Sequence, residues 1–208
     1  KIATSTNWIP LVLVFLFTVI AFLKIIDAEK LKGYVFALFN KSFIADEAEE
    51  DASFFNPFYS LLFVFSSIVL ALTISLLVSQ RNVHFILSFS FFLSVLKLVF
   101  SYLIIKSALE LAFARLFLIK KQVRFYLVSK FSSLYSISFF LLVFFVLFQF
   151  SPLNYSCFIF ITLTLFFLRF ILQLGNNKNL VFSELFYFIL YICAFEIAPL
   201  LTLFKLML

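Results

Sequence analysis

Long apolar stretches constrain the fold of this chain more than any other feature of its sequence. A helix that spans a membrane needs about 20 mostly apolar residues. Six stretches meet this requirement, at residues 8–26, 57–79, 85–105, 131–150, 153–173 and 184–206. Inside lipid no water can satisfy the backbone polar groups, so segments of this length must be helical. The sequence therefore predicts an all-α polytopic membrane protein with about six transmembrane helices in a single domain, residues 1–208.

Composition supports burial in lipid. The chain is 65% hydrophobic and 12% charged, with a mean hydropathy of +1.18, whereas a soluble globular protein is about half apolar and about a quarter charged. Both cysteines, Cys157 and Cys193, fall inside apolar runs, and the sequence contains no CxxC motif and no Cys/His cluster. We therefore expect no metal site and no cofactor.

Two connecting segments, residues 29–43 and 106–130, have the periodicity of amphipathic helices. In the first segment, Lys30 falls on a polar face and Tyr34 on an apolar face when residues advance by 100°. In the second segment the same projection gathers one charged stripe, formed by Lys106, Glu110, Lys120, Lys121 and Arg124. Such helices lie in the headgroup plane or extend a spanning helix beyond the bilayer. We interpret both as cytoplasmic-side elbow helices.

A run of acidic residues follows the first of these segments and consists of Asp46, Glu47, Glu49, Glu50 and Asp51. Charge runs usually face solvent, so a solvated loop is the first interpretation. Docking against the basic segment 106–130, or against a basic partner, is the second. Both charged segments are predicted surfaces for lipid headgroups or partner subunits.

The distribution of positive charge predicts the orientation in the membrane. Of the 16 Lys and Arg residues, twelve lie in or beside the first, third and fifth connections, three lie on the opposite side, and Lys97 lies within a span. Cytoplasmic loops carry the excess of Lys and Arg. We therefore place these connections in the cytoplasm and both termini in the periplasm. The formal charge of +6 suits anionic lipids of the inner leaflet, not nucleic acid, because the basic residues flank spans.

Two ionisable residues, Lys97 and Glu196, lie deep within predicted spans. In the predicted topology, Lys97 is 13 residues from the outer start of its helix at His84, and Glu196 is 10 residues from the outer end at Leu206. Their depths differ by only about 5 Å, at about 1.5 Å per residue. We interpret them as a structural ion pair, and a proton- or ion-conducting site is the alternative. Pro199 cannot donate a helical hydrogen bond to the Phe195 carbonyl, which predicts a kink beside Glu196.

The closing residues resemble the C-terminal signature of a known bacterial family. Tyr191, Cys193, Glu196, Pro199 and Lys205 follow the pattern Tyr-x-Cys-x-x-Glu-x-x-Pro, then apolar residues and Lys. In these residues the chain resembles the Bacteroidota inner-membrane proteins grouped as domain of unknown function 4271, and nearly the whole chain takes part in the similarity. The resemblance implies a multi-span protein of the bacterial inner membrane, and it implies no activity, substrate or catalytic residue.

Three classes of function compete for such a chain. A non-catalytic scaffold or accessory subunit of a larger cell-envelope assembly, for example secretion or gliding machinery, is the favoured hypothesis, with other membrane or cytoplasmic subunits as partners. A small transporter or channel that uses Lys97 and Glu196 is the alternative. Transporters commonly contain helices that glycine or proline interrupts, whereas both glycines of this chain lie outside the predicted spans. We expect no enzymatic activity, because the sequence contains no HExxH, GxSxG or P-loop motif.

The predicted orientation can be tested with a reporter fused after Leu208. We expect a reporter that is active only in the periplasm to give signal, because the positive connections hold both termini on that side. A fusion that is active only in the cytoplasm would contradict the predicted topology.

Overall fold

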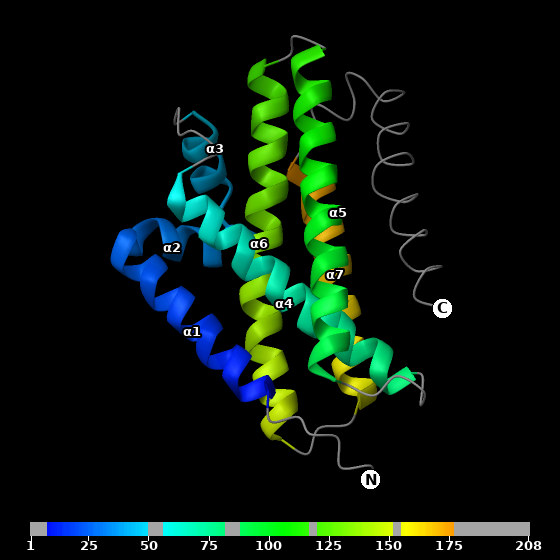
Figure 1. Cartoon of the computed structure of the whole chain (residues 1–208). Helices are drawn as coiled ribbons and strands as arrows, with labels where there is room; N and C mark the ends of the chain where they lie inside the picture. Colours follow the sequence, from blue (N-terminus) through cyan, green and yellow to red (C-terminus); the bar gives the residue numbers. More distant parts are fainter. Residues whose placement is uncertain (1–7, 50–55, 82–87, 117–119, 152–154, 177–208) are drawn as a thin grey trace.

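The computed structural model describes residues 8–49, 56–81, 88–116, 120–151 and 155–176, and within these ranges all regular structure is α-helical (Figure 1). The helices are α1 (Trp8–Ile26), α2 (Ala28–Val35), α3 (Lys41–Glu49), α4 (Pro57–Arg81), α5 (Phe89–Leu116), α6 (Lys120–Phe150) and α7 (Tyr155–Asn176). The prediction of an all-α fold is confirmed for this part of the chain.

Five of these helices are long and apolar enough to cross a membrane. Their apolar segments are Trp8–Ile26, Pro57–Ser79, Phe89–Leu109, Leu127–Phe150 and Tyr155–Leu172. They correspond to the first five predicted spans, and the sixth predicted span, residues 184–206, lies outside the described residues. The starts of α1, α5 and α7 lie near the ends of α4 and α6, at the lower end of the molecule in Figure 1. The long helices therefore alternate in direction along the chain. This alternation and the five apolar helices indicate a multi-pass membrane protein.

The first predicted elbow helix, residues 29–43, is wrong as a single element. The chain instead forms α2 and α3, with a turn between them. Asp27 caps α2 by accepting a hydrogen bond from the Lys30 amide at 2.9 Å, and Asn40 accepts one from the Phe43 amide at 3.3 Å at the start of α3. Side chains of this type compete with helical hydrogen bonds and so begin a new helix. Gly33 permits the tight fold, because a Cβ atom there would collide with the Phe43 ring.

The second predicted elbow helix, residues 106–130, is not a separate element either. Its first part forms the end of α5, and its second part forms the start of α6. The charged segment therefore extends two spanning helices, which was one of the two arrangements that its periodicity allowed.

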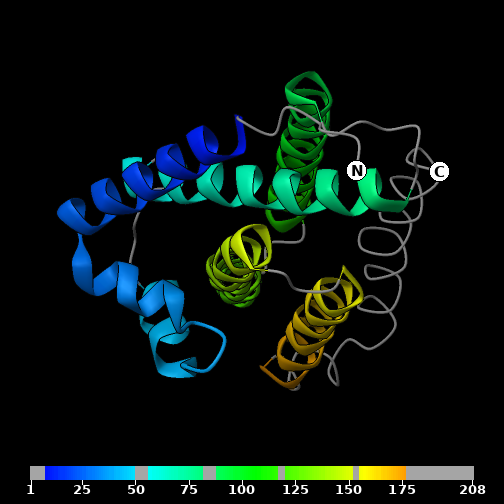
Figure 2. The ribbon, with the colours of Figure 1, turned by 90° about the horizontal axis from the view of Figure 1, so that it is seen from below.

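Helix α6 lies at the centre of the described structure. Seen from below, α4 and α7 flank it on two sides and α2 and α3 lie on a third (Figure 2), and α6 contacts all four of these helices and α5. Small buried residues lie in the middle part of this helix, at Ser129, Ser132, Ser133, Ser136 and Ser138. Small side chains let neighbouring membrane helices approach closely, and they explain how α6 accommodates five neighbours.

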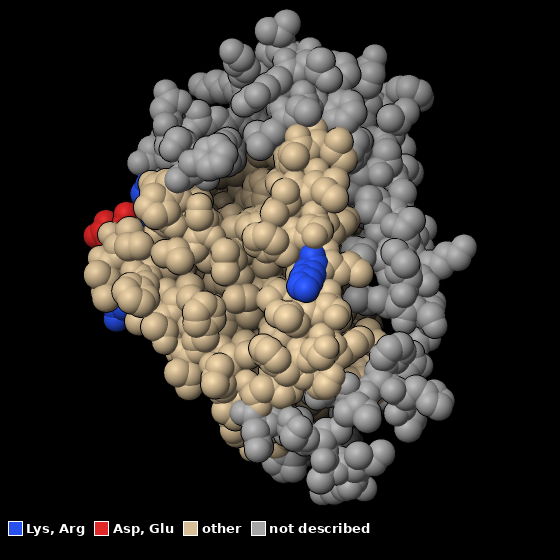
Figure 3. Space-filling model, in the orientation of Figure 1, with Lys and Arg blue, Asp and Glu red and all other residues tan. Residues whose placement is uncertain are grey.

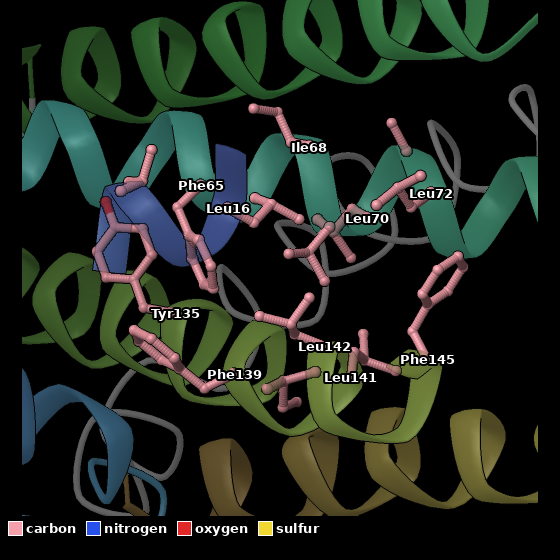
Figure 4. Close-up of a cluster of buried hydrophobic side chains, with 14 of the residues drawn as sticks. Leu16, Phe65, Ile68, Leu70, Leu72, Tyr135, Phe139, Leu141, Leu142 and Phe145 are labelled. Carbon is pink, nitrogen blue, oxygen red and sulfur yellow. The ribbon is translucent and has the colours of Figure 1, made fainter. Parts of the chain in front are cut away.

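The apolar core lies mainly between α4 and α6 (Figure 4). Phe65 of α4 packs against Phe139 of α6, with ring centroids 4.7 Å apart. Leu16 adds a contribution from α1 to the same cluster. A stripe of small residues that the sequence shows on α4 is fully buried in this interface region, and it contains Ser66, Ser67, Ala71 and Ser75.

We predict that Ser136→Ala destabilises the fold more than Ser138→Ala. Both hydroxyls are buried, but Ser136 Oγ donates to the Val35 carbonyl of α2 at 2.7 Å, whereas Ser138 Oγ donates within its own helix, to Leu134, at 2.9 Å. Only the first substitution removes a bond between helices and leaves a carbonyl at a helix end without its partner. We expect a loss of about 1–2 kcal/mol for Ser136→Ala in denaturant unfolding from detergent micelles. Equal losses for the two variants would contradict the proposed role of Ser136.

Candidate functional site

A buried carboxylate lies where four helices converge, and it is the centre of the candidate site. Glu47 of α3 is only 7% exposed. Around it lie Lys30 and Tyr34 of α2, Tyr59 of α4 and Tyr135 of α6. We call these five residues the Glu47 cluster.

Polar contacts to Glu47 hold the cluster together. The Tyr59 hydroxyl donates a hydrogen bond to Glu47 Oε1, and Lys30 Nζ lies 3.9 Å from the same oxygen. A buried charge is costly unless it is both paired and hydrogen-bonded, and Glu47 has both kinds of partner. The contacts join α2, α3 and α4 through a single side chain.

Tyr34 forms the aromatic wall of the cluster. Its ring meets the rings of Phe43, Tyr135 and Tyr59 edge-on, with centroid distances of 5.1, 5.7 and 6.1 Å. Burial, followed by the charge of Glu47, raises the pKa of the Tyr34 hydroxyl far above its ordinary value, and hydrogen bonding to Glu47 acts in the same direction. The hydroxyl therefore remains protonated at neutral pH and remains able to donate to the carboxylate.

The polar contacts of this cluster hold neighbouring helices together. The Tyr59 hydroxyl and the Lys30 ammonium both engage Oε1 of Glu47. Among the described residues, no group of three or more His, Cys, Asp and Glu residues is placed to hold a metal ion. The contacts of the Glu47 cluster join α2 and α3 to α4.

Comparison with known proteins assigns the chain to a family. The sequence profile described as "Domain of unknown function (DUF4271)" matches residues 9–207. The chain belongs to this family. The match confirms the resemblance found in the C-terminal signature. No curated protein and no solved structure matches the chain.

The acidic run of this DUF4271 protein is not the solvated loop that its charge predicts. Residues 41–49 form α3, and within it Asp46 is exposed while Glu47 is buried. Glu49 ends the helix, and Glu50 and Asp51 lie outside the described residues. The loop interpretation is therefore wrong for residues 46–49, which are helical, although Asp46 is exposed as that interpretation expects. Helix α3 packs on α6, but docking of these acids on the basic segment 106–130 stays a prediction.

The predicted basic stripe is distributed over two helices. Glu110 belongs to α5, and Lys120, Lys121 and Arg124 belong to the start of α6. Lys106 is partly exposed, and its Nζ donates to the Tyr102 hydroxyl at 3.3 Å and lies 5.6 Å from the centroid of that ring. The role of these residues as a surface for lipids or partners stays a prediction.

The predicted pair of Lys97 and Glu196 is only half within the described residues. Lys97 is exposed on α5, and on the face that Figure 3 shows, basic side-chain atoms lie over α5 in an otherwise uncharged region. Glu196 and Pro199 lie outside the described residues, so the ion pair and the kink stay predictions.

Arg169 has a role that the sequence did not indicate. Its position near the end of a span favours a side chain that reaches the headgroups. The structure instead directs it at α6, where Nε donates to Ser133 Oγ at 3.2 Å and Nη2 donates to the Lys130 carbonyl at 3.4 Å. These bonds join α7 to the central helix.

The sequence contains a signal for the burial of Glu47, although the charge run conceals it. Glu47 follows Ile44 by three residues, so the two share one face of a helix, and Ile44 is buried. Lys30 and Tyr34 are one turn apart and reach the same carboxylate. When the acids are treated as one run, the difference between Glu47 and its exposed neighbour Asp46 is lost.

We predict that Glu47→Gln lowers the stability of the DUF4271 protein while Asp46→Asn does not. The first substitution removes the charge that accepts from Tyr59 and pairs with Lys30, and hydrogen bonds to charged groups contribute about 1.5–3 kcal/mol. We expect a loss of about 1–3 kcal/mol, measured by denaturant unfolding in detergent. Asp46→Asn removes an equal charge from an exposed site and should change stability by less than about 0.5 kcal/mol. If the two variants were equally stable, the contacts of Glu47 would not stabilise the packing of these helices.

Proposed function

We propose that this DUF4271 protein is a non-catalytic subunit of the bacterial inner membrane, a scaffold or accessory component of a larger cell-envelope assembly. The observation that carries the proposal is the length of α5 and α6. Both helices continue well past their apolar segments, on the same side of the molecule (Figure 1).

These helices are longer than the hydrocarbon core of a bilayer requires. Helix α5 has 28 residues and α6 has 31, which correspond to about 42 and 46 Å at 1.5 Å per residue. The hydrocarbon core is about 30 Å thick. Residues 110–116 and 120–126 therefore form a helical arm beyond the apolar segments Phe89–Leu109 and Leu127–Phe150.

The composition of the helical arm suits a charged partner. It contains one acid, Glu110, and four basic residues, Arg115, Lys120, Lys121 and Arg124. Anionic lipid headgroups attract basic residues next to spanning helices, and a pair of helices that continues past the hydrocarbon core offers contact area to a second protein. In the proposed topology the arm is cytoplasmic, residues 184–206 form a sixth span, and both termini are periplasmic.

The interior supports a structural function rather than a chemical one. The Glu47 cluster places its buried charge between helices and engages it with Lys30 and Tyr59. Arg169 likewise bonds to α6. These polar groups hold helices in place, and a fixed bundle with a projecting arm is the form expected of an assembly component.

We predict that reversing charge on the helical arm releases partner proteins. Native-host membranes are cross-linked, solubilised in mild detergent, and the purified protein is analysed by quantitative mass spectrometry. The test variant is Lys120→Glu/Lys121→Glu. The matched control is Lys24→Glu/Lys32→Glu, which makes the same charge change at exposed positions at the end of α1 and on α2. Stoichiometric partners should fall about tenfold with the arm variant, a change equivalent to about 1.4 kcal/mol, and remain with the control.

Two results would contradict the assembly proposal. One is that both double variants retain the same proteins in the same amounts. The other is that the wild-type protein purifies alone and moves ions across liposome membranes, a result that would favour the transport alternative and its Lys97/Glu196 site.

A further inference from the structure

One face of α5 exposes a stripe that contains a lysine at membrane depth. Leu93, Lys97, Phe100 and Ile104 are all exposed. Their spacings of four, three and four residues place them on a single helix face. We call these four residues the Lys97 stripe.

The lysine distinguishes this stripe from an ordinary lipid-facing surface. Exposed apolar side chains are expected in lipid, but a charged residue within a span almost always faces protein or a water-filled cavity. Lys97 lies 8 residues from the start of the apolar segment Phe89–Leu109 and 12 from its end, or about 12 and 18 Å along the helix. Among the described residues, none forms a hydrogen bond or ion pair with its side chain. A protein segment that covers the stripe and supplies a negative charge would satisfy both the exposed apolar face and its lysine.

We propose that residues 184–206 of the same chain cover the Lys97 stripe, with Glu196 placed against Lys97. This inference rests on the sixth span of the proposed topology. The segment is mostly apolar between Glu184 and Lys205 at its two ends and carries one carboxylate in its interior, at a depth within about 5 Å of that of Lys97. Opposite charges at one depth reduce the cost that either would have alone in lipid.

The proposed contact fixes a register that can be tested. In the proposed topology α5 runs inward and residues 184–206 run outward, so the two helices are antiparallel. Pairing Lys97 with Glu196 then places Phe100 opposite the native Cys193, and Leu93 opposite Leu200. Val99 lies at nearly the same depth as Phe100, but it is only 5% exposed and faces the core.

Disulfide formation tests this register directly. In a Cys157→Ser background, Phe100→Cys is oxidised in native membranes, and free thiols are then counted after denaturation with a maleimide-linked polymer. We expect a monomer on non-reducing gels that takes up no polymer before reduction and two polymer chains after it. Val99→Cys in the same background is the matched control and should take up two chains without reduction.

Several outcomes would overturn the proposal. The proposal is wrong if the Phe100→Cys variant takes up polymer without reduction, as Val99→Cys does. It is also wrong if the Phe100→Cys variant forms a disulfide-linked dimer, because that result would assign the stripe to a second copy of the chain. If Phe100→Cys does not fold, Leu93→Cys/Leu200→Cys in a background with both native cysteines replaced by serine tests the same register. A disulfide within one chain supports the proposal, and its absence overturns it.

Charge exchange gives an independent readout. Lys97→Glu and Glu196→Lys should each reduce the yield of monodisperse protein several-fold, and the double exchange should restore it. Lys106→Glu combined with Glu196→Lys is the control and should restore nothing. A reporter after Leu208 that is active only in the cytoplasm would show that the prediction of a sixth span is wrong, which is a separate result. If that reporter is periplasmic and neither the disulfide nor the rescue is found, only the docking proposal fails.

Discussion

The structure depends on satisfying a buried carboxylate at one end of the helix bundle. Glu47 can occupy its position only because Tyr59 donates to it and Lys30 lies beside it. These contacts come from α2 and α4, and Glu47 itself belongs to α3, so one side chain joins all three helices. Tyr34 closes the cluster as a protonated donor, because burial and the neighbouring carboxylate raise its pKa.

Polar contacts between helices continue along the bundle on the central helix, α6. Lipid offers no hydrogen bonds, so polar side chains between helices must find partners within the protein. Ser136 supplies a donor to the end of α2, and Ser133 accepts from Arg169 of α7. Small buried residues on α6 allow this close approach, and the aromatic core against α4 fills the space between these bonds. The resulting bundle carries a helical arm, which is the basis of the proposed role in an assembly.

Hydropathy alone was sufficient to predict the five long apolar helices that the structure describes, because length and apolar content are local properties of the sequence. The positions at which one helix ends and the next begins were harder to predict. The turn between α2 and α3 depends on capping by Asn40 and on the space that Gly33 leaves for Phe43, and a projection at 100° per residue detects neither. Glu47 was missed because its burial comes from partners on other helices, and a charge run carries no information about them. The pair of Lys97 and Glu196 stays a prediction.

The central claim is that α2 and α3 are docked on the bundle by the Glu47 cluster rather than lying free at the membrane surface. Hydrogen–deuterium exchange of the wild-type protein in lipid nanodiscs, read by mass spectrometry, tests it most directly. Docked helices open only with the structure that holds them, so the backbone amides of residues 31–47 should exchange nearly as slowly as those of α4 near Tyr59. Exchange of residues 31–47 at the rate of an unprotected segment, while α4 remains protected, would contradict the account.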